Sequence, residues 1–595
     1  MVPDWLAPFD RAVLATVVPL ALLFLLSGFD DLLVDLAWLY AWVEYRVSRS
    51  GLPKQESRPL IDVPARRIAI VVPLWHEHEV ITQMLEHNLA STRYSSYHIF
   101  AGTYPNDELT TSAVRAVAGR FPNVHLAVCP HDGPTSKADC LNWVYQHIGV
   151  YEEQAGEHFD IIVTHDAEDM IHPDELTWIN RYAERYDFVQ IPVFALKTPW
   201  WDIIHGIYCD EFAENHNRDM VVRSRFRCFV PSCGVGTGYR REALENLAKT
   251  QGNRIFEPDS LTEDYENGLR LRRLGCTQVF ASPWRTGGPG SDFVATREFF
   301  PRTWRSAQRQ RTRWVTGIAL QGWERFGWEG NYKEIYWLWR DRKGLVGSPM
   351  GVLANAVFLY GLATHMWMRF APLEMHLTAA TLALQLVRIT IRMGCVTRVY
   401  GLLFALGVPP RALCANALNA TATLGALLHY ARAKMTREPL RWLKTEHSYP
   451  SRVALLPHKR QLGQILTDTG FLGADALARA LETRPLGVRL GEHLLARGDI
   501  TEQDLYQALS LQQGLPLMHL DAFDLSKGVA RALPKPVLKK WRVLPFKITD
   551  CGLSIASPDL PTPAMTQALQ NFTAMEIRFH LLTPTEFERA TDTLI

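Results

Sequence analysis

Phe159–Met170, read as FDIIVTHDAEDM, is the stretch that decides the fold. Its apolar, β-branched run from Asp160 to Thr164 is typical of a buried parallel strand. The run ends in His165-Asp166-Ala167-Glu168-Asp169, so three carboxylates follow the carboxyl end of a strand, where open α/β sheets bind ligands. Crowded carboxylates repel one another, and a divalent cation that bridges them to phosphate oxygens relieves this repulsion. The alternative is a solvated acidic turn that caps a helix after Pro173.

The same strand pattern occurs three times before this stretch. Apolar runs at 68–73, 97–103 and 124–128 are followed by helical segments or by loops that lead into them. Strands that alternate with helices predict a doubly wound parallel sheet. After the first strand, His76-Glu77-His78-Glu79 lacks the helical spacing of a zinc motif. We expect Glu77 to contact a nucleotide base or ribose instead.

The totals exclude several classes of protein. The net charge of +1 over 595 residues argues against a nucleic-acid polymer as partner. Nine cysteines without a CxxC pair favour reduced thiols in a cytoplasm-facing protein over a disulfide framework or a zinc site. Eighteen tryptophans and a hydrophobic content of 47% indicate a membrane contribution.

Three regions are predicted to span a membrane, and a fourth is predicted to lie at its surface. The uncharged run Ala12–Phe29 predicts a retained membrane helix, followed by an amphipathic segment to about Tyr45. Gly344–Met368 predicts a second span, and 372–396 a weaker third, in which Arg388 and Arg392 would snorkel toward the cytoplasm. Residues 411–430 are too polar to span and predict an interfacial helix. The basic residues after each group place the bulk of the chain in the cytoplasm.

Two loops and an arginine-rich segment complete the candidate site. Residues 231–241 form a glycine-rich loop whose backbone can approach a ligand closely, but it lacks a dinucleotide fingerprint. Residues 259–266 open a helix over 267–274, either as a simple capping box or as a functional acidic turn. Six arginines lie between 297 and 313, where the alternatives are a lipid-facing basic surface or a phosphate-binding helix.

Four motifs occur in the order and spacing of the family-two processive glycosyltransferases, the group of cellulose and hyaluronan synthases, and the chain resembles that family over roughly residues 68–320. The motifs are Asp107, the cluster Asp166–Asp169, Thr262-Glu263-Asp264 and Gln310-Arg311-Thr312-Arg313-Trp314. Two departures from the family pattern are Asn106-Asp107 in place of a paired aspartate, and Glu168 with Asp169 in place of the second carboxylate of DxD.

This resemblance implies a GT-A fold and an inverting, metal-dependent transfer from a UDP-sugar. Asp166, with Glu168 or Asp169, would hold Mg²⁺ or Mn²⁺ against the diphosphate. Asp264 would be the catalytic base, with Glu263 beside it. The other implied contacts are Glu77, Asp107 and Lys137 to uridine, ribose or phosphate, Gln310 and Arg313 to the diphosphate, and Trp314 to the acceptor sugar.

The C-terminal region contains an internal repeat with a period of 28 residues. Leu462, Gly463, Leu466, Gly470, Leu472, Leu477, Ala480 and Leu481 return as Leu490, Gly491, Leu494, Gly498, Ile500, Leu505, Ala508 and Leu509. Each unit predicts a short helix, a glycine stop and a second helix. The alternative to a ligand site is a duplicated helical hairpin used only for packing. Residues 533–595 predict a small α+β companion.

Arg489–Leu494 resembles the cyclic di-GMP-binding repeat of the MshE N-terminal domain. In the first unit Gln461 stands at the expected arginine, with Arg460 one residue earlier, and Arg484 replaces the terminal glutamine that the second unit keeps as Gln512. The residues implied to bind cyclic di-GMP are Arg460, Leu462, Gly463, Leu466, Gly470, Arg489, Leu490, Gly491, Leu494, Gly498 and Gln512.

Over nearly its whole length the chain resembles the bacteriophage N4 adsorption protein B family of bacterial inner-membrane glycosyltransferases. The resemblance implies a membrane segment (1–66), a GT-A domain (67–343), membrane and interfacial helices (344–445) and a cyclic di-GMP-binding domain (446–595). It further implies that cyclic di-GMP controls exopolysaccharide synthesis for a biofilm from an N-acetylhexosamine donor such as UDP-N-acetylmannosamine, with an outer-membrane export partner. The alternatives are a transferase acting on a lipid carrier, and a non-catalytic dinucleotide-sensing scaffold or phage adsorption factor.

Overall fold

The computed structural model describes residues 7–48, 63–282, 293–437, 440, 461–468, 471–485, 487–513, 515–518, 527–530, 532–549, 552–573, 575 and 577–594. The chain forms two units. The first unit contains residues 1–81 and 96–450, and the second unit contains residues 82–95 and 451–595. Arg460 and Gly470, both predicted to bind cyclic di-GMP, lie outside the described residues.

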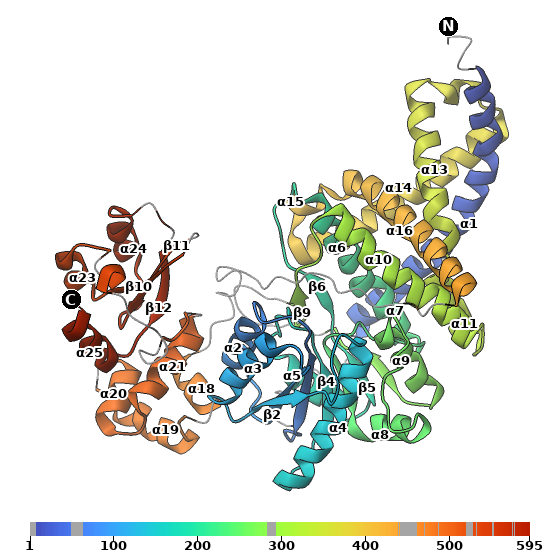
Figure 1. Cartoon of the computed structure of the whole chain (residues 1–595). Helices are drawn as coiled ribbons and strands as arrows, with labels where there is room; N and C mark the ends of the chain where they lie inside the picture. The colour runs from blue at the N-terminus through green and yellow to red at the C-terminus, as the bar shows by residue number, and fades with distance from the viewer. Residues whose placement is uncertain are drawn as a thin grey trace. The chain divides into compact units, whose positions relative to one another are not determined.

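A seven-stranded sheet forms the centre of the first unit, in the order β3-β2-β1-β4-β7-β5-β8 (Figure 1). The strands are β1 (Ile68–Pro73), β2 (Tyr97–Thr103), β3 (Val124–Val128), β4 (Ile161–Thr164), β5 (Phe188–Gln190), β7 (Thr237–Arg240) and β8 (Gln278–Phe280). The first four are parallel and confirm the predicted strands. The aliphatic and aromatic residues of β1, β2 and β4 are buried, as expected of strands covered on both faces, whereas Val128 at the end of the edge strand β3 is exposed.

The prediction of a wholly parallel sheet is wrong at β7, which runs antiparallel to both β4 and β5. The glycine-rich loop explains the reversal. Gly234 and Gly236 adopt φ of 81° and 59°, a conformation that glycine adopts without strain. The amide of Gly236 then donates to the Thr164 carbonyl at 3.0 Å, so the chain returns alongside β4.

Helices cover this sheet and connect it to a second layer. They are α3 (Glu108–Ala118), α4 (Lys137–Ala155), α5 (Glu175–Tyr182), α6 (Ile203–Glu214), the π-helix Asn215–Asp219, α7 (Met220–Arg225), α8 (Arg241–Thr250) and α9 (Glu263–Arg273). A small parallel sheet pairs β6 (Val193–Ala195) with β9 (Thr296–Glu298). Beyond it follow α10 (Trp304–Trp314), the π-helix Val315–Gln321, α11 (Gly322–Phe326) and α12 (Tyr332–Arg342).

Three described helices are long and apolar enough to cross a membrane, and they project together from the first unit (Figure 1). They are α1 (Ala7–Ser48), α13 (Gly344–Ala363) and α14 (Pro372–Tyr400). Helix α1 is continuous, so the predicted membrane helix and amphipathic segment are one element. A 3₁₀ turn (Met366–Arg369) joins α13 to α14, and the short α15 (Leu402–Ala405) leads to α16 (Val408–Thr436), which is not among these candidate spans.

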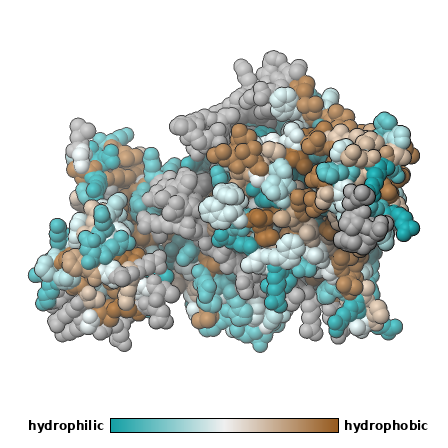
Figure 2. All heavy atoms as spheres, turned by 90° about the horizontal axis from the view of Figure 1, so that it is seen from above, coloured by the Kyte–Doolittle hydropathy of each residue, from teal (hydrophilic) through white to brown (hydrophobic). Residues whose placement is uncertain are grey.

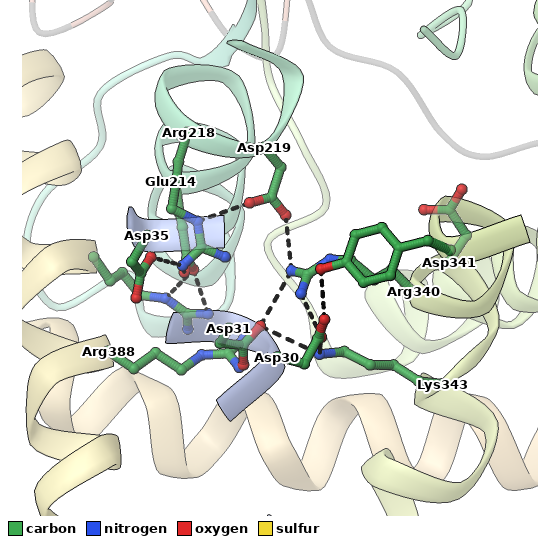
Figure 3. Close-up of polar contacts among 12 residues, drawn as sticks. Asp30, Asp31, Asp35, Glu214, Arg218, Asp219, Arg340, Asp341, Lys343 and Arg388 are labelled. Carbon is green, nitrogen blue, oxygen red and sulfur yellow. Dashed lines mark hydrogen bonds and ion pairs between the residues drawn. The ribbon is translucent and has the colours of Figure 1, made fainter. Parts of the chain in front are cut away.

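A buried ionic network joins α1 and α14 to the rest of the first unit (Figure 3). Asp31 of α1 accepts from Arg340 at 3.1 Å and from Lys343 at 3.2 Å, and it also pairs with Arg388 of α14. Arg392 pairs with Glu214 at 2.5 Å. These two arginines therefore have carboxylate partners, in place of the predicted snorkelling to the membrane edge. The network begins after roughly 18 apolar residues of α1, which correspond to about 27 Å of helix, close to the thickness of a hydrocarbon layer.

The second unit contains α2 (Ile81–Ser91), apart from its first residue, together with paired short helices and a small sheet. The repeat forms α18 (Leu462–Asp468), α19 (Ala474–Thr483), α20 (Leu490–Arg497) and α21 (Glu502–Gln513), as predicted. The companion contains α22 (Lys527–Ala530), α23 (Lys535–Trp541), β10 (Leu544–Thr549), β11 (Gly552–Ser557), α24 (Pro563–Gln570), β12 (Ile577–Leu581) and α25 (Pro584–Leu594). Strand β11 pairs antiparallel with β10 and parallel with β12, which confirms an α+β arrangement.

The two halves of the repeat pack in the same way. A Cβ on Gly463 would lie 2.9 Å from Leu477 and 3.2 Å from Leu490. A Cβ on Gly491 would lie 2.6 Å from Leu505 and 3.4 Å from Leu462. Both repeated glycines thus allow close helix contact, which supplies a packing reason for the repeat besides any ligand.

Candidate active site

One pocket gathers residues from β1, α4, the loop after β4, α9, β9 and α10. Nine predicted residues line it: Glu77, Lys137, Asp166, Glu168, Glu263, Asp264, Gln310, Arg313 and Trp314. They are separated by up to 237 residues in sequence, from 77 to 314, and meet at the carboxyl ends of the parallel strands. Two further predicted residues, Asp107 and Asp169, are described but lie outside the lining of this pocket.

Lys137 and Asp166 form the strongest contact in the pocket. Ser136 caps α4 by accepting from the Asp139 amide, which places Lys137 in the first turn, opposite the end of β4. Its ammonium nitrogen lies 2.5 Å from Oδ1 and 2.8 Å from Oδ2 of Asp166. Burial alone would lower the pKa of Lys137, but the carboxylates of Asp166, Glu263 and Asp264 raise that pKa well above its usual range. The pocket therefore holds a permanent cation beside its acids.

Asp169 lies behind the pocket in a fully buried network. Its Oδ2 is 2.8 Å from Nδ1 of His165 and accepts from the Asp166 amide at 2.9 Å. On the other side of the ring, His165 Nε2 lies 3.1 Å from Glu175. Burial lowers the pKa of His165, but Glu175 and Asp169 outweigh it and raise the pKa to about 9. This geometry supports the loop that carries Asp166 and Glu168, and it does not aim Asp169 at a ligand in the pocket.

Asp107 also acts on the backbone. It is buried, caps α3 through the Thr110 amide at 3.4 Å, and accepts from the His76 amide at 2.7 Å. The second contact fixes the turn that carries Glu77 into the pocket. Asp107 thus holds a neighbouring loop, and the predicted direct contact with uridine would need a rearrangement.

Glu263 and Asp264 begin α9, where they face Lys137. Their cap residue Thr262 makes no side-chain capping bond, so the simple capping-box interpretation does not apply. Gly234 lies against Asp264, because a Cβ there would be 2.8 Å from its Oδ2. Burial and, after it, the charge of Asp264 raise the pKa of Glu263 to about 7. Burial also raises the pKa of Asp264, against the opposing effect of Lys137.

Helix α10 presents Gln310, Arg313 and Trp314 to the pocket. The Trp314 ring packs against three aromatic side chains. Its centroid lies 6.1 Å from that of Tyr208, 6.3 Å from that of Phe212 and 6.5 Å from that of Phe300. Arg311 of the same helix is buried, and its guanidinium group donates to Glu211 at 2.8 Å and to Asn419 at 2.6 Å. It therefore fixes α10 between α6 and α16.

Sequence analysis missed Glu298 and an aromatic pair. Glu298 of β9 lines the pocket, and burial together with Asp169, Glu168 and Asp166 raises its pKa far above the ordinary value. Trp75 and Tyr104 line the opposite end, with ring centroids 5.3 Å apart. Their positions just after β1 and β2, at the sheet edge where ligands bind, were the available signal. Glu298 was hidden within an arginine-rich segment.

The donor set fits a hard divalent cation that is completed by substrate. Among the described residues, no group of three or more His, Cys, Asp or Glu side chains is arranged to hold a metal by itself. Mg²⁺ and Mn²⁺ in nucleotide sites use one or two carboxylates together with phosphate oxygens and water. Asp166 and Glu168 can supply such a partial shell.

Comparison with known proteins identifies both units. Residues 64–317 match the model of "Glycosyltransferase like family 2", and residues 513–594 match that of the MshEN domain. The second match begins after Gln512, so the repeat precedes it. The chain is 34% identical over 607 residues to bacteriophage adsorption protein B of Escherichia coli K12, which covers 97% of this chain and 81% of that protein. The predicted GT-A glycosyltransferase fold is thereby confirmed.

Two solved structures are similar to parts of the chain. The mannosyltransferase PcManGT from Pyrobaculum calidifontis, in complex with GDP-Man and Mn²⁺, is 18% identical with a TM-score of 0.41, and the match covers 67% of this chain and 99% of that one. MshE with cdg is 24% identical with a TM-score of 0.21, and the match covers 23% of this chain and 100% of that one.

Proposed function

Because the chain belongs to the bacteriophage N4 adsorption protein B family, we propose that it is a membrane glycosyltransferase controlled by cyclic di-GMP. It transfers a sugar from a UDP-sugar, with inversion, onto an exopolysaccharide. The donor class is an N-acetylated hexosamine, with UDP-N-acetylmannosamine as the first candidate. The single observation that carries the proposal is that acids, cations and an aromatic ring from six elements meet in one pocket.

The donor end of the pocket neutralises the leaving diphosphate. Asp166 and Glu168 would hold Mg²⁺ or Mn²⁺, which would supply positive charge to the phosphate oxygens. Lys137 and Arg313 add cationic donors, and Gln310 adds a neutral one. Trp75 and Tyr104 provide apolar faces for the base, next to Glu77. Together they hold the sugar-phosphate bond in one orientation, which lowers the entropic cost of the reaction.

The acceptor end activates a hydroxyl group. Asp264 removes the hydroxyl proton as the oxygen attacks the anomeric carbon, while the bond to the diphosphate breaks on the opposite face. One carboxylate at this position is sufficient for a single displacement with inversion. Trp314 stacks on the apolar face of the acceptor sugar. Glu263, beside Asp264, raises the affinity of the pair for a proton.

Regulation and location follow from the other parts of the chain. The MshEN match and the Arg489 repeat support cyclic di-GMP binding by the second unit. The dinucleotide activates only if it binds the active arrangement better than the idle one. The three candidate spans support a place in the bacterial inner membrane, with the pocket and second unit cytoplasmic and an export partner in the outer membrane. The small number of described spans keeps a lipid-linked acceptor as the alternative to a growing polymer.

A UDP-release assay on the full chain in nanodiscs tests the proposal. A panel of UDP-sugars is offered with Mn²⁺ or Mg²⁺, with and without cyclic di-GMP, and product length is read on a gel. Asp264→Asn and Arg313→Ala should lose turnover, whereas Arg309→Ala, an exposed arginine of the same helix, should retain it. Full turnover by Asp264→Asn and Arg313→Ala would refute the assigned roles, and UDP binding without turnover on any sugar would favour the scaffold.

A further inference from the structure

A group of exposed apolar side chains lies on the first unit, outside the candidate spans. Trp200 and Trp201, just before α6, are 71% and 66% exposed. Leu402, Leu403 and Leu406, in and after α15, are 62%, 86% and 57% exposed. We call these five residues, together with Trp304, the tryptophan–leucine surface. Exposed apolar area of this kind costs free energy in water and marks an interaction site.

Specific bonds hold the separate segments of this surface together. Lys197 Nζ donates to the Tyr400 carbonyl at 3.1 Å, and the Tyr400 hydroxyl donates to the Ala195 carbonyl at 2.7 Å. Arg302 forms an ion pair with Asp202 at 2.5 Å. This ion pair links the start of α10, where Trp304 is 39% exposed, to the segment that carries Trp200 and Trp201.

A shared core lies beneath the same segments. Phe404 and Ala405 of α15 are buried in one cluster with Ile207, Tyr208 and Phe300. The exposed side chains are therefore carried by segments that pack on a buried core.

Its position indicates what covers it. Tyr400 ends the candidate span α14, and only Gly401 separates it from α15. Figure 1 shows α15 at the top of the first unit, on the side from which α1, α13 and α14 project. Figure 2 looks onto this side and shows hydrophobic side chains among polar ones. Tryptophan favours the headgroup level of a bilayer, and the exposed Arg305 is suited to a lipid phosphate.

We propose that the tryptophan–leucine surface rests in the interfacial layer of the bilayer, as a second lipid contact besides the spanning helices. This contact fixes the pocket relative to the lipid. Trp304 and Trp314 are ten residues apart on α10, about 15 Å along the helix, and Trp314 lines the pocket. The acceptor end of the pocket is thus held one short helix away from the membrane surface.

Bromolipid quenching tests this contact without any need for activity. The full chain is placed in nanodiscs with or without bromine near the headgroup end of the acyl chains. Subtracting the emission of a Trp200→Phe/Trp201→Phe variant isolates these two of the 18 tryptophans. We expect bromine to remove most of that difference emission. The matched control is Trp323→Phe/Trp328→Phe, from exposed tryptophans at α11, whose difference emission should not change.

Two results would overturn the proposal. The first is a difference emission from Trp200 and Trp201 that bromine leaves intact, with both variants melting like the parent protein. The second is a dimer in detergent that Leu403→Asp splits into monomers, because this would assign the surface to a second copy of the chain. Loss of the difference emission with bromolipid, in a chain that remains monomeric, supports the lipid contact, whatever the transferase assay shows.

Discussion

The ammonium nitrogen of Lys137 lies 2.5 Å and 2.8 Å from the two carboxylate oxygens of Asp166. A nucleotide contact and a metal ligand, as proposed here, are therefore bonded to each other before any donor enters. In the proposed donor complex, Asp166 would bind the metal ion and Lys137 the phosphates, so each would exchange one ionic partner for another.

Lys137→Met should weaken donor binding. The variant loses a charge-assisted bond to the phosphates and leaves Asp166 without its cation, so KM for the UDP-sugar should rise at least about tenfold. Lys137→Arg, which keeps the charge, is the control and should lose less. Unchanged KM in steady-state UDP release by Lys137→Met would contradict the role.

Gly234→Ala should impair catalysis more than stability. An added Cβ would meet Asp264 Oδ2 at 2.8 Å, so the proposed base must move. The backbone φ of 81° adds about 1 kcal/mol of strain for alanine. Gly252→Ala is a matched control, since φ is 62° there and no atom lies within 4 Å of the new Cβ. The measurement is turnover, compared once the two variants are shown to bind UDP equally well. Equal turnover by Gly234→Ala and Gly252→Ala would contradict the close contact between position 234 and Asp264.

The acid limb of the pH–rate profile should lie above the ordinary titration range of an aspartate. Asp264 acts only when deprotonated, and burial raises its pKa, so activity is lost as the pH falls through that raised value. Because the pKa of Glu263 is about 7, we expect Glu263 and Asp264 together to take up a proton near neutral pH. Glu263→Gln removes one negative charge and should move the limb to lower pH. A limb that stays in place or moves upward would exclude this coupling.

Asp169→Asn should destabilise the first unit by about 3 kcal/mol, because it leaves the buried charge of His165 with one partner fewer. The measurement is the denaturation midpoint in detergent. Glu108→Gln is the control, since it breaks an exposed pair with Arg115 at 3.3 Å and should cost less than about 1 kcal/mol. A similar loss of stability in Asp169→Asn and Glu108→Gln would mean that the buried contacts of His165 stabilise the protein no more than an ion pair on the surface.

The strands β1 to β4 could be predicted because buried parallel strands are short apolar runs, and Ile161–Thr164 is one. The direction of β7 could not be predicted, since the pattern of apolar residues in a strand does not show whether the strand runs parallel or antiparallel to its neighbours. Sequence proximity also could not separate Asp166 from Asp169. The two differ in which way the loop turns them, and the amide of one bonds the carboxylate of the other.

Long-range pairing was equally invisible. Asp31 and Arg388 are 357 residues apart and each looks costly in an apolar helix when taken alone. Their opposite charges neutralise each other only when the folded chain brings the two helices together. Glu298 was overlooked for a related reason, because its short strand contains only three residues and lies among arginines. Gln310, Arg313 and Trp314 were found because one helical turn already fixes their spacing.

Arg489→Ala should reduce cyclic di-GMP affinity at least about tenfold, since it removes a charged donor from the start of α20. Arg489 is exposed, so the second unit should keep its melting temperature. Arg497→Ala is the control, because that side chain pairs with Asp499 at 2.7 Å and Thr483 at 2.8 Å and should leave affinity unchanged. Gly491→Ala separates binding from packing, since its Cβ would lie 2.6 Å from Leu505 and should loosen the hairpin. If calorimetry gives normal affinity for Arg489→Ala while Gly491→Ala only lowers the melting temperature, the repeat is a packing device and the nucleotide binds elsewhere.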